Sequence, residues 1–482
     1  MTIVRIGAHM LALLKKGGVV FVFLTLAVIG SQAQTLTTLV TFDDGINVLD
    51  PDGIVQGFDG NFYGTTRNDG SSVNDHGTVF VLSRTGSLKT LYNFCSGSSC
   101  GGYEPAAGVI LGRDGNFYGT TSAGGSSACN NGCGTVYKIS RDGNVTTLHT
   151  FGEQDGSFPE DALIQASDGN FYGTTLQGGC HAGLFCSGTV FRITPGGKLT
   201  TIHSFCQQLG CPDGESPYAG VVQASDGNLY GTTSTTIFRI TPANEFTTLY
   251  TFANGSGARG LVQAADGNLY GTTTAGGTNG QGTIFQMTLA GSFTTLYNFC
   301  SLTNCLDGSV PMSLIQATDG NFYGTTQSGG AYCLPSGCGT IFSFTPAGTL
   351  ATIYNFCAQT SCPDGRFPAA DLMQATNGNF YGTTGGDFYG TTGNTAFRLS
   401  TGLGPFVTFA MKTGKVGGTA EILGQGFTGT TSVSFNGVPA SFTVHSGTLL
   451  LAKVPTGATT GFVTVTTPSG TLTSNVAFQV IP

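Results

Sequence analysis

The chain has 482 residues, of which 9% are charged, 77 are glycine and none is tryptophan, and its formal net charge is −8. Disordered proteins combine low hydrophobicity with high charge, so this composition excludes a largely disordered chain. There is no run of Lys and Arg, and with the acidic balance this argues against nucleic acid as a partner.

The first 33 residues have the pattern of a secretory signal peptide. Arg5, Lys15 and Lys16 supply positive charge, residues 19–29 form an apolar core, and Ser-Gln-Ala precedes Gln34, where we expect the mature chain to begin. The apolar core is short for a spanning helix, which takes about 20 residues. We therefore expect an exported protein, in the periplasm, at the cell surface or outside the cell, with no membrane insertion after cleavage. A retained anchor is the alternative.

The octapeptide DGNFYGTT, or a close variant, occurs seven times at intervals of 40 to 58 residues. The copies begin at Asp59, Asp114, Asp168, Asp226, Asp266, Asp319 and Asn377. A period in this range indicates a repeat architecture, in which each unit buries its apolar faces only against its neighbours.

The third repeat shows the expected strands, which we call A to D. They are 162–166 (ALIQA), 170–175 (NFYGTT), 188–194 (GTVFRIT) and 199–205 (LTTIHSF). Asp-Gly between A and B and Pro-Gly-Gly between C and D suit tight antiparallel turns. Four-stranded units repeated radially describe a β-propeller, so we expect an all-β, seven-bladed propeller over 34–400.

The two ends of the repeat region predict how the ring closes. The first strand-D copy, residues 35–42 (TLTTLVTF), precedes every A strand, and no clear D strand follows Ser400. We predict that the N-terminal strand completes the seventh blade and so removes an exposed sheet edge. Extra length lies mostly in the D–A and B–C loops, which share one face of a propeller.

The 14 cysteines form seven local pairs, each separated by four to six positions. The pairs are Cys95 with Cys100, Cys129 with Cys133, Cys180 with Cys186, Cys206 with Cys211, Cys300 with Cys305, Cys333 with Cys338 and Cys357 with Cys362. An even count, short spacings and an export signal predict disulfides that stiffen the long loops, each contributing about 2 kcal/mol. A zinc site needs a tetrahedral set with two-residue spacing or nearby His ligands, and the sequence shows neither. We expect no metal and no other cofactor.

After a linker, 401–405 (TGLGP), the repeat stops. Residues 406–482 contain short alternating runs at the spacing of a small β-sandwich. The segments GTAEILGQGF, VSFNGVPA and AKVPTGATTGFVTVTTPSG closely resemble an IPT/TIG domain, which has an immunoglobulin-like fold.

The repeats resemble the GloVer tandem repeat of bacterial exported proteins sometimes labelled "choice-of-anchor". The resemblance rests on Gln165-Ala166, on 168–175 (DGNFYGTT), on 188–191 (GTVF) and on their copies, over about residues 35–400. It implies an exported, surface-associated protein and brings no catalytic residues. The given sequence ends at Ile481-Pro482, directly after the last expected strand, without a C-terminal hydrophobic segment, lipobox Cys or sorting tail, so we do not expect a covalent or membrane anchor.

No convergent catalytic set is visible in the sequence. His149 and His203 occupy a strand-D slot that is Tyr in other copies, so we expect both to be structural. His76 and His181 fall in loops of different blades. The Asp of each DGN offers one carboxylate beside a hairpin glycine, which suits a turn better than calcium.

The loop face carries aromatic and charged side chains of the kind that recognise carbohydrate or protein. The candidate ligand-binding residues are Tyr103, Glu104, Phe158, Glu160, Glu215, Tyr218, Arg366 and Phe367. The absence of Trp weakens the case for sugar stacking.

Two functions follow as hypotheses. The first is a non-enzymatic binding or interaction protein that presents disulfide-stiffened loops. The alternative is a carbohydrate-active lyase or hydrolase that uses two carboxylates of the loop face. Acids clustered around the central channel would favour the enzyme, and acids scattered outward would favour the binding protein. A structural role in a cell-surface layer also stays open.

Overall fold

The computed structural model describes residues 34–42, 50–68, 76–94, 101–126, 128–129, 131–179, 187–253, 255, 257–368, 370–385 and 394–481. The chain divides into two compact units, 1–33 and 34–482, and the predicted signal peptide lies outside the described residues. The described part is all-β, apart from one short 3-10 turn at Thr303–Cys305. None of its helical segments has the length and apolar character needed to cross a bilayer.

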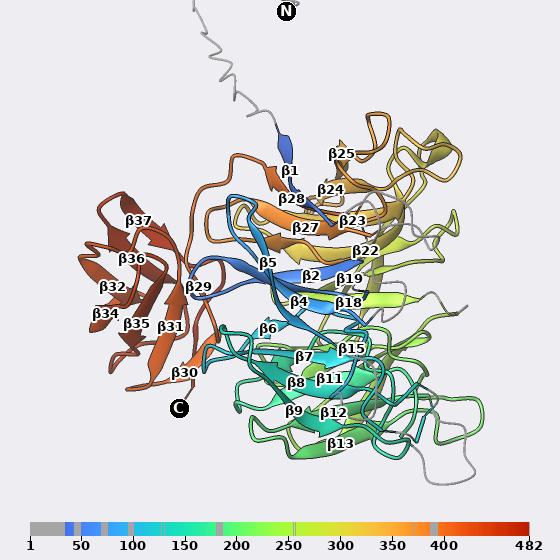
Figure 1. Ribbon diagram of the computed structural model, residues 1–482, viewed down its shortest axis with the longest axis horizontal. Helices are drawn as coiled ribbons and strands as arrows, with labels where there is room; N and C mark the ends of the chain where they lie inside the picture. The colour runs from blue at the N-terminus through green and yellow to red at the C-terminus, as the bar shows by residue number, and fades with distance from the viewer. Residues whose placement is uncertain are drawn as a thin grey trace, which may run out of the picture. The chain divides into compact units, whose positions relative to one another are not determined.

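Each repeat forms one four-stranded antiparallel sheet, and the described residues contain seven of them (Figure 1). Sheet 1 contains β2 (Pro51–Gln56), β3 (Phe62–Thr66), β4 (Thr78–Leu82) and β5 (Leu88–Asn93). Sheet 2 contains β6 (Ile110–Leu111), β7 (Phe117–Thr121), β8 (Thr135–Ile139) and β9 (Val145–Thr150). Sheet 3 contains β10 (Ile164–Gln165), β11 (Phe171–Thr175), β12 (Thr189–Ile193) and β13 (Leu199–Ser204). Sheet 4 contains β14 (Val221–Gln223), β15 (Leu229–Thr232), β16 (Thr236–Ile240) and β17 (Phe246–Thr251).

The remaining three sheets follow the same order. Sheet 5 contains β18 (Ala258–Gln263), β19 (Leu269–Thr273), β20 (Thr283–Met287) and β21 (Phe293–Asn298). Sheet 6 contains β22 (Ser309–Gln316), β23 (Phe322–Ser328), β24 (Thr340–Phe344) and β25 (Leu350–Asn355). Sheet 7 contains β26 (Met373–Gln374), β27 (Phe380–Thr384), β28 (Thr395–Ser400) and the N-terminal strand β1 (Thr35–Thr41).

Strand β1 takes the D position of sheet 7, as the sequence predicts. It pairs antiparallel with β28 from Thr35 opposite Ser400 to Thr41 opposite Thr395, and Figure 1 shows the two strands side by side. The next residue, Phe42, is only 2% exposed and packs on Phe80 of sheet 1 at 5.1 Å between ring centroids. The N-terminal segment therefore bonds to sheet 7 and fills the core beside sheet 1.

The repeated octapeptide makes a fixed set of hydrogen bonds. In sheet 1 the Asn61 amide donates to Asp59 Oδ1, and the Tyr63 hydroxyl donates to Asp59 Oδ2 at 2.9 Å. The same Tyr–Asp bond, at 2.8–3.0 Å, occurs in sheets 1 to 6. The last Thr of each octapeptide bonds to a strand-C Thr, such as Thr66 to Thr78 at 2.8 Å. These bonds confirm that the DGN aspartate serves a turn.

Neighbouring sheets are joined by stacked rings and by glutamine side chains. Tyr63 of sheet 1 stacks on Phe117 of sheet 2 at 4.0 Å, and Tyr381 of sheet 7 packs on Phe62 of sheet 1 at 4.1 Å. Six glutamines accept a turn N–H from the preceding sheet: Gln165, Gln223, Gln263, Gln316, Gln374 and Gln56. In sheet 2, Leu111 occupies the equivalent position, so the junction of sheets 1 and 2 lacks this link.

Replacing Gln56 by Leu should lower the free energy of unfolding by about 1–3 kcal/mol, because it leaves the buried N–H of Thr376 without its acceptor. Urea unfolding of residues 34–482 measures the change. Leu111→Gln is the matched control, since that junction already lacks the link. An unchanged midpoint for Gln56→Leu would show that the bond between sheets 1 and 7 contributes nothing.

The C-terminal residues form two four-stranded sheets and a parallel pair. One sheet contains β29 (Thr408–Phe409), β31 (Thr419–Leu423), β35 (Leu449–Lys453) and β34 (Phe442–Val444). The other contains β33 (Val438–Pro439), β32 (Ser432–Phe435), β36 (Val463–Thr467) and β37 (Gly470–Thr473). The parallel pair is β30 (Thr413–Lys415) with β38 (Gln479–Ile481). One apolar core, which includes Ile422, Phe435 and Val465, joins both sheets.

This C-terminal module contacts the short A–B turns of the repeat sheets. The Thr448 hydroxyl donates to the carbonyl of Phe58 in sheet 1 at 2.7 Å. The Gln479 side chain donates to the carbonyl of Ser225 in sheet 4 at 3.1 Å. The Gln425 amide donates to the Thr376 hydroxyl in sheet 7 at 2.9 Å. The module thus lies on the side of the repeat sheets that carries the short A–B turns, which we call the turn side. The long D–A and B–C loops lie on the opposite side, which we call the loop side.

Candidate functional site

Charged side chains from sheets 1, 3, 5 and 7 converge on the loop side, where the first strand of each sheet begins. We call this group the mouth cluster: Asp50, Asp52, Arg67, Glu160, Asp161, Arg259 and Asp371. Arg67 Nη2 lies 3.4 Å from Glu160 Oε2, which joins sheet 1 to sheet 3 across sheet 2. The charges of Asp50, Glu160 and Asp161 all act on Asp52, and those of Asp161 and Arg259 act on Asp371.

The fold does not require acids at these positions. Asp52 and Asp161 each lie four residues before the linking glutamine of their sheet, where sheets 2 and 4 have Ala107 and Ala219. In all four sheets the backbone carbonyl at this position accepts a bond from a strand-B threonine of the preceding sheet. Because the carbonyl makes this bond in all four sheets, the position accepts Ala as well as Asp, although the Asp161 carboxylate makes further bonds to the N–H groups of Gly220 and Ala162.

Asp52 is the most perturbed acid of the cluster. Burial raises its pKa to about 8, although Arg67 acts in the opposite direction, and its Oδ2 is buried with no hydrogen-bond partner. Burial also raises the pKa of Asp161, whose two oxygens accept the N–H groups of Gly220 and Ala162. The surrounding protein raises the pKa of Asp371 as well, but that residue is exposed and water screens the effect. We therefore place the strongest perturbation on Asp52.

The hydroxyl of Tyr137 is a second buried polar atom without a hydrogen-bond partner, and the charge of Asp52 acts on it. Tyr137 in β8 is 0% exposed and its hydroxyl has no hydrogen-bond partner, whereas the equivalent residue of the other sheets is Phe, as in Phe80 and Phe191. Burial, and then the charge of Asp52, raises the pKa of Tyr137. A buried hydroxyl without a partner costs free energy, so the hydrophobic core does not explain its presence.

Five sheets place a non-glycine residue in the left-handed region just before a proline, four of them in the D–A loop and sheet 6 near the start of β22. These residues are Glu104 (φ 56°), Phe158 (φ 57°), Ser216 (φ 50°), Val310 (φ 55°) and Phe367 (φ 53°). This left-handed backbone conformation costs about 1–3 kcal/mol at each non-glycine residue and is common at ligand-binding sites. The repeats keep this strained backbone and vary the side chain, which is the arrangement expected of recognition positions.

The structure groups the predicted site residues into separate pairs. Glu160 belongs to the mouth cluster, and Arg259 of that cluster lies over the ring of Tyr218 at 5.9 Å. Arg366 lies over Phe367 at 5.5 Å. Tyr103 packs against His76 at 5.1 Å and donates to the carbonyl of Asn131. Glu104 and Phe158 are the strained positions above, and the Glu215 carboxylate lies within 4.8 Å of the sulfurs of Cys206 and Cys211.

Four other acids of the loop side serve structure. His149 Nε2 lies 2.8 Å from Asp155, and His203 Nε2 lies 2.9 Å from Asp213. The hydroxyls of Tyr297 and Tyr354 donate to Asp307 and Asp364 in the same way. This confirms the structural prediction for His149 and His203, and burial lowers the pKa of His203.

Of the seven residues of the mouth cluster, only Glu160 is among the candidate ligand-binding residues predicted from the sequence. Aligning the repeats on their glutamines would have shown that Asp52 and Asp161 share a position that is Ala in other copies. Arg67 follows β3 without any repeated counterpart, and Arg259 lies in a bulge of β18. The same alignment places Arg259 four residues before Gln263, at the position of Asp52 and Asp161, so of these two only Arg67 lacks a sequence signal.

Five of the seven predicted disulfides are confirmed: Cys129–Cys133, Cys206–Cys211, Cys300–Cys305, Cys333–Cys338 and Cys357–Cys362. The other two stay predictions, because their four cysteines lie outside the described residues: Cys95, Cys100, Cys180 and Cys186. The structure therefore neither confirms nor contradicts the bond between Cys95 and Cys100, nor the bond between Cys180 and Cys186.

Two of the disulfides come together in a way that the sequence analysis did not predict. Folding brings the four sulfurs of Cys333, Cys338, Cys357 and Cys362 within 4.8 Å of one another. The sequence prediction considered each pair alone, and the B–C and D–A loops meet only in the folded protein.

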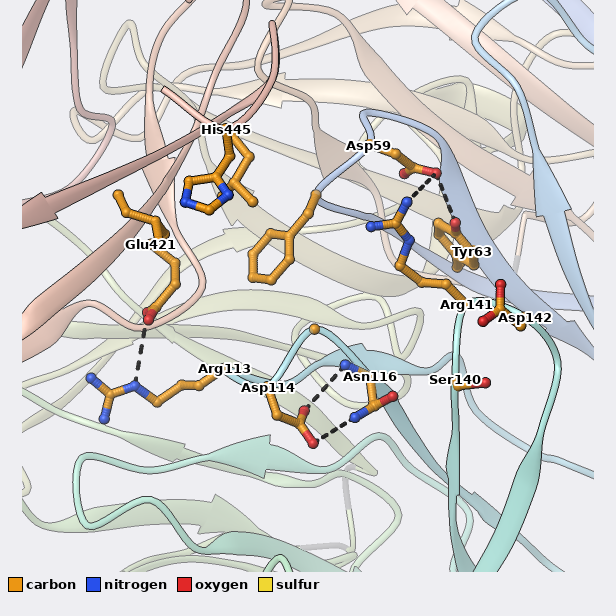
Figure 2. A pocket seen from close by; sticks show the side chains of 14 residues that line it. Asp59, Tyr63, Arg113, Asp114, Asn116, Ser140, Arg141, Asp142, Glu421 and His445 are labelled. Carbon is orange, nitrogen blue, oxygen red and sulfur yellow. Dashed lines mark hydrogen bonds and ion pairs between the residues drawn. The ribbon is translucent and has the colours of Figure 1, made fainter. Parts of the chain in front are cut away.

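A recess of about 640 Å³ lies on the turn side, at the junction of sheets 1 and 2 that lacks the glutamine link (Figure 2). Arg113 Nε lies 3.9 Å from Glu421 Oε2 of the C-terminal module, and Arg141 reaches Asp59 at 4.0 Å. Burial raises the pKa of Glu421. Two ion pairs thus occupy four of the charged side chains that line the recess, so the recess is a weaker candidate site than the mouth cluster.

The comparisons with known proteins agree with this fold. The family model described as the Gloeobacter/Verrucomicrobia repeat matches residues 14–236 and 233–437. No curated protein matches the chain. A solved streptogramin B lyase is 16% identical with a TM-score of 0.52, over 76% of this chain and 97% of that chain. Virginiamycin B lyase from Staphylococcus aureus is 14% identical with a TM-score of 0.53, over 76% and 99%. Identities this low show a propeller-like fold and nothing about activity.

Proposed function

The chain belongs to the Gloeobacter/Verrucomicrobia repeat family, and from that premise we propose an exported protein built from a closed seven-bladed β-propeller and a C-terminal immunoglobulin-like IPT/TIG domain. The ring contact of Tyr381 with Phe62 and the bond from Thr376 to Gln56 support closure, because both join sheet 7 to sheet 1. Five disulfides support export, since such bonds persist in oxidising compartments.

The protein binds a carbohydrate at the mouth cluster, without turning it over. The observation that carries this proposal is the convergence of charged side chains from four sheets at one place on the loop side. Carboxylates accept, and guanidinium groups donate, the hydrogen bonds that sugar hydroxyls make. The ring of Tyr218, held against Arg259, offers an apolar face beside them. A protein partner at the cell surface is the other ligand class that such a surface fits.

A carbohydrate-active lyase or hydrolase is the second candidate. The acids do gather in one cluster, which is the arrangement that favours the enzyme. Asp52, with a pKa of about 8, would hold a proton at neutral pH, while Glu160 is paired with Arg67. A carboxyl group that burial keeps protonated, beside a second carboxylate, is the usual general acid of glycoside chemistry. Binding ranks first because Glu160 and Asp161 already have partners in the protein.

A glycan array and polysaccharide pull-down with residues 34–482 test both candidates, with product analysis on every ligand found. We expect Tyr218→Ala and Arg259→Ala to weaken binding at least about tenfold, which corresponds to about 1.4 kcal/mol. Asp142→Ala, on the turn side, is the control and should bind normally. If the unsubstituted chain turns over a ligand, and if Asp52→Asn abolishes this turnover but still binds the ligand, the protein is an enzyme. Binding that neither Tyr218→Ala nor Arg259→Ala weakens would place the ligand elsewhere.

A further inference from the structure

Two disulfides of sheet 6 lie against each other. Cys333 and Cys338 belong to the loop between β23 and β24, and Cys357 and Cys362 belong to the loop after β25. The four Sγ atoms all lie within 4.8 Å of one another. By contrast, Cys300 and Cys305 belong to no such group among the described residues.

The two disulfides lie close enough together for their four sulfurs to reach the spacing of a tetrahedral metal site once both S–S bonds are opened. Zinc binds thiolate sulfur at about 2.3 Å, which places the four sulfurs of a tetrahedral site about 3.8 Å apart. Four residues separate the cysteines within each pair, at the upper end of the usual range for zinc ligands. Movements of about 1 Å would therefore convert this set into a four-thiolate site.

Hydrogen bonds that do not involve sulfur hold both loops in place. The Phe367 N–H donates to the carbonyl of Cys338 at 2.9 Å, which ties the second loop to the first. The Cys357 N–H donates to Asp364 Oδ2 at 3.0 Å, and the Tyr354 hydroxyl donates to the same oxygen at 2.7 Å. Opening the disulfides leaves these bonds intact, so the four thiols would remain together.

Access to the sulfurs is uneven. Cys338 is only 1% exposed, whereas Cys333 is exposed and the two other cysteines are partly exposed. A small reductant can therefore reach the set from the side of Cys333, and thiol–disulfide exchange requires such access. The buried Cys338 sulfur would anchor the inner corner of a metal site.

We propose that Cys333, Cys338, Cys357 and Cys362 form one site with two states: two disulfides when oxidised, and a tetrahedral thiolate site for zinc when reduced. Two dithiol molecules supply four electrons and four protons, become two cyclic disulfides and leave four thiols. A zinc ion then displaces the four thiol protons and forms four Zn–S bonds. Each disulfide closes one loop, whereas the metal would join the two loops to each other.

This proposal is tested by an anaerobic metal titration of residues 34–482 after reduction by a phosphine. The phosphine opens each disulfide with one water, becomes the phosphine oxide and, unlike a dithiol, does not add thiol ligands. Cobalt(II) should give the intense visible absorption of a tetrahedral thiolate site, and zinc should abolish it. Cys333→Ser/Cys338→Ser should bind one equivalent less than the unsubstituted chain. The control Cys300→Ser/Cys305→Ser should lose none.

A second pair of variants shows whether the four cysteines act as one site. Cys357→Ser/Cys362→Ser should lose the same single equivalent, and the fourfold variant should lose no more than either double variant. In the unsubstituted reduced chain, zinc should also protect all four cysteines from alkylation. This measurement does not depend on whether any variant folds. Equal zinc uptake by Cys333→Ser/Cys338→Ser and the unsubstituted chain, or alkylation of these cysteines in the presence of zinc, would overturn the proposal.

Discussion

Deletion of residues 34–42 is expected to lower the free energy of unfolding of the repeat sheets by at least about 4 kcal/mol. The deletion removes β1, so that β28 becomes an unpaired edge, and it removes Phe42 from the core beside Phe80. Phe42→Ala alone should cost about 3–5 kcal/mol, the usual range for truncating a buried aromatic ring. Urea and thermal unfolding, followed by circular dichroism, measure both changes.

Thr41→Ala is the matched control, because Thr41 is exposed and lies next to Phe42 in the same segment. Its effect should stay within about 0.5 kcal/mol. A synthetic peptide of residues 34–42 should restore part of the stability lost by the deletion, since it can pair again with β28. If Phe42→Ala unfolds at the same urea concentration as the unsubstituted chain, the N-terminal segment does not hold sheets 7 and 1 together.

Asp52→Asn is expected to make the protein more stable at alkaline pH, with little change at pH 4. Burial raises the pKa of Asp52 to about 8 from its ordinary value of 3.8, so the folded state binds a proton that the unfolded state has released. Stability therefore falls as pH rises between these two values. Asparagine does not titrate, so the variant should gain about 2 kcal/mol over the unsubstituted chain between about pH 4.5 and pH 9. We expect less than full linkage because water reaches part of the side chain.

Asp161→Asn is the comparison variant. The Asp161 carboxylate accepts two backbone N–H groups, and an amide oxygen cannot replace both oxygens as acceptors. This variant should lose about 1–2 kcal/mol at pH 7. Urea unfolding from pH 4 to pH 9 measures both substitutions. A gain for Asp52→Asn that does not grow with pH would show that Asp52 is solvated like a surface carboxylate.

Local patterns in the sequence predicted the turns and strands well. The spacing of Asp59, Gly60 and Asn61 identified a tight turn, because the side chain of Asp accepts the N–H two residues later. The role of Tyr63 was not foreseen, although it lies only four residues from Asp59. Its hydroxyl reaches the aspartate only after the chain has reversed direction, which a reading of residue types does not show.

The candidate site was predicted only in part. Glu160 and Tyr218 were identified from their loops, and the structure places both beside arginines that the sequence did not single out. Arg67 and Glu160 are 93 residues apart in the chain and meet across a whole sheet. Distances of this kind depend on how sheets pack on one another, so no local pattern contains them.

The sequence by itself determined the repeat, the four strands of each unit, the place of the N-terminal strand and the pairing of the five described disulfides. Each of these depends on turns, alternation or short spacings, which a few neighbouring residues encode. Only the tertiary structure decided which acids meet in the mouth cluster and that the sulfurs of Cys338 and Cys357 lie within 4.8 Å of each other. Both depend on packing between segments distant in sequence, where burial changes the protonation of Asp52 and apposed loops bring separate pairs together.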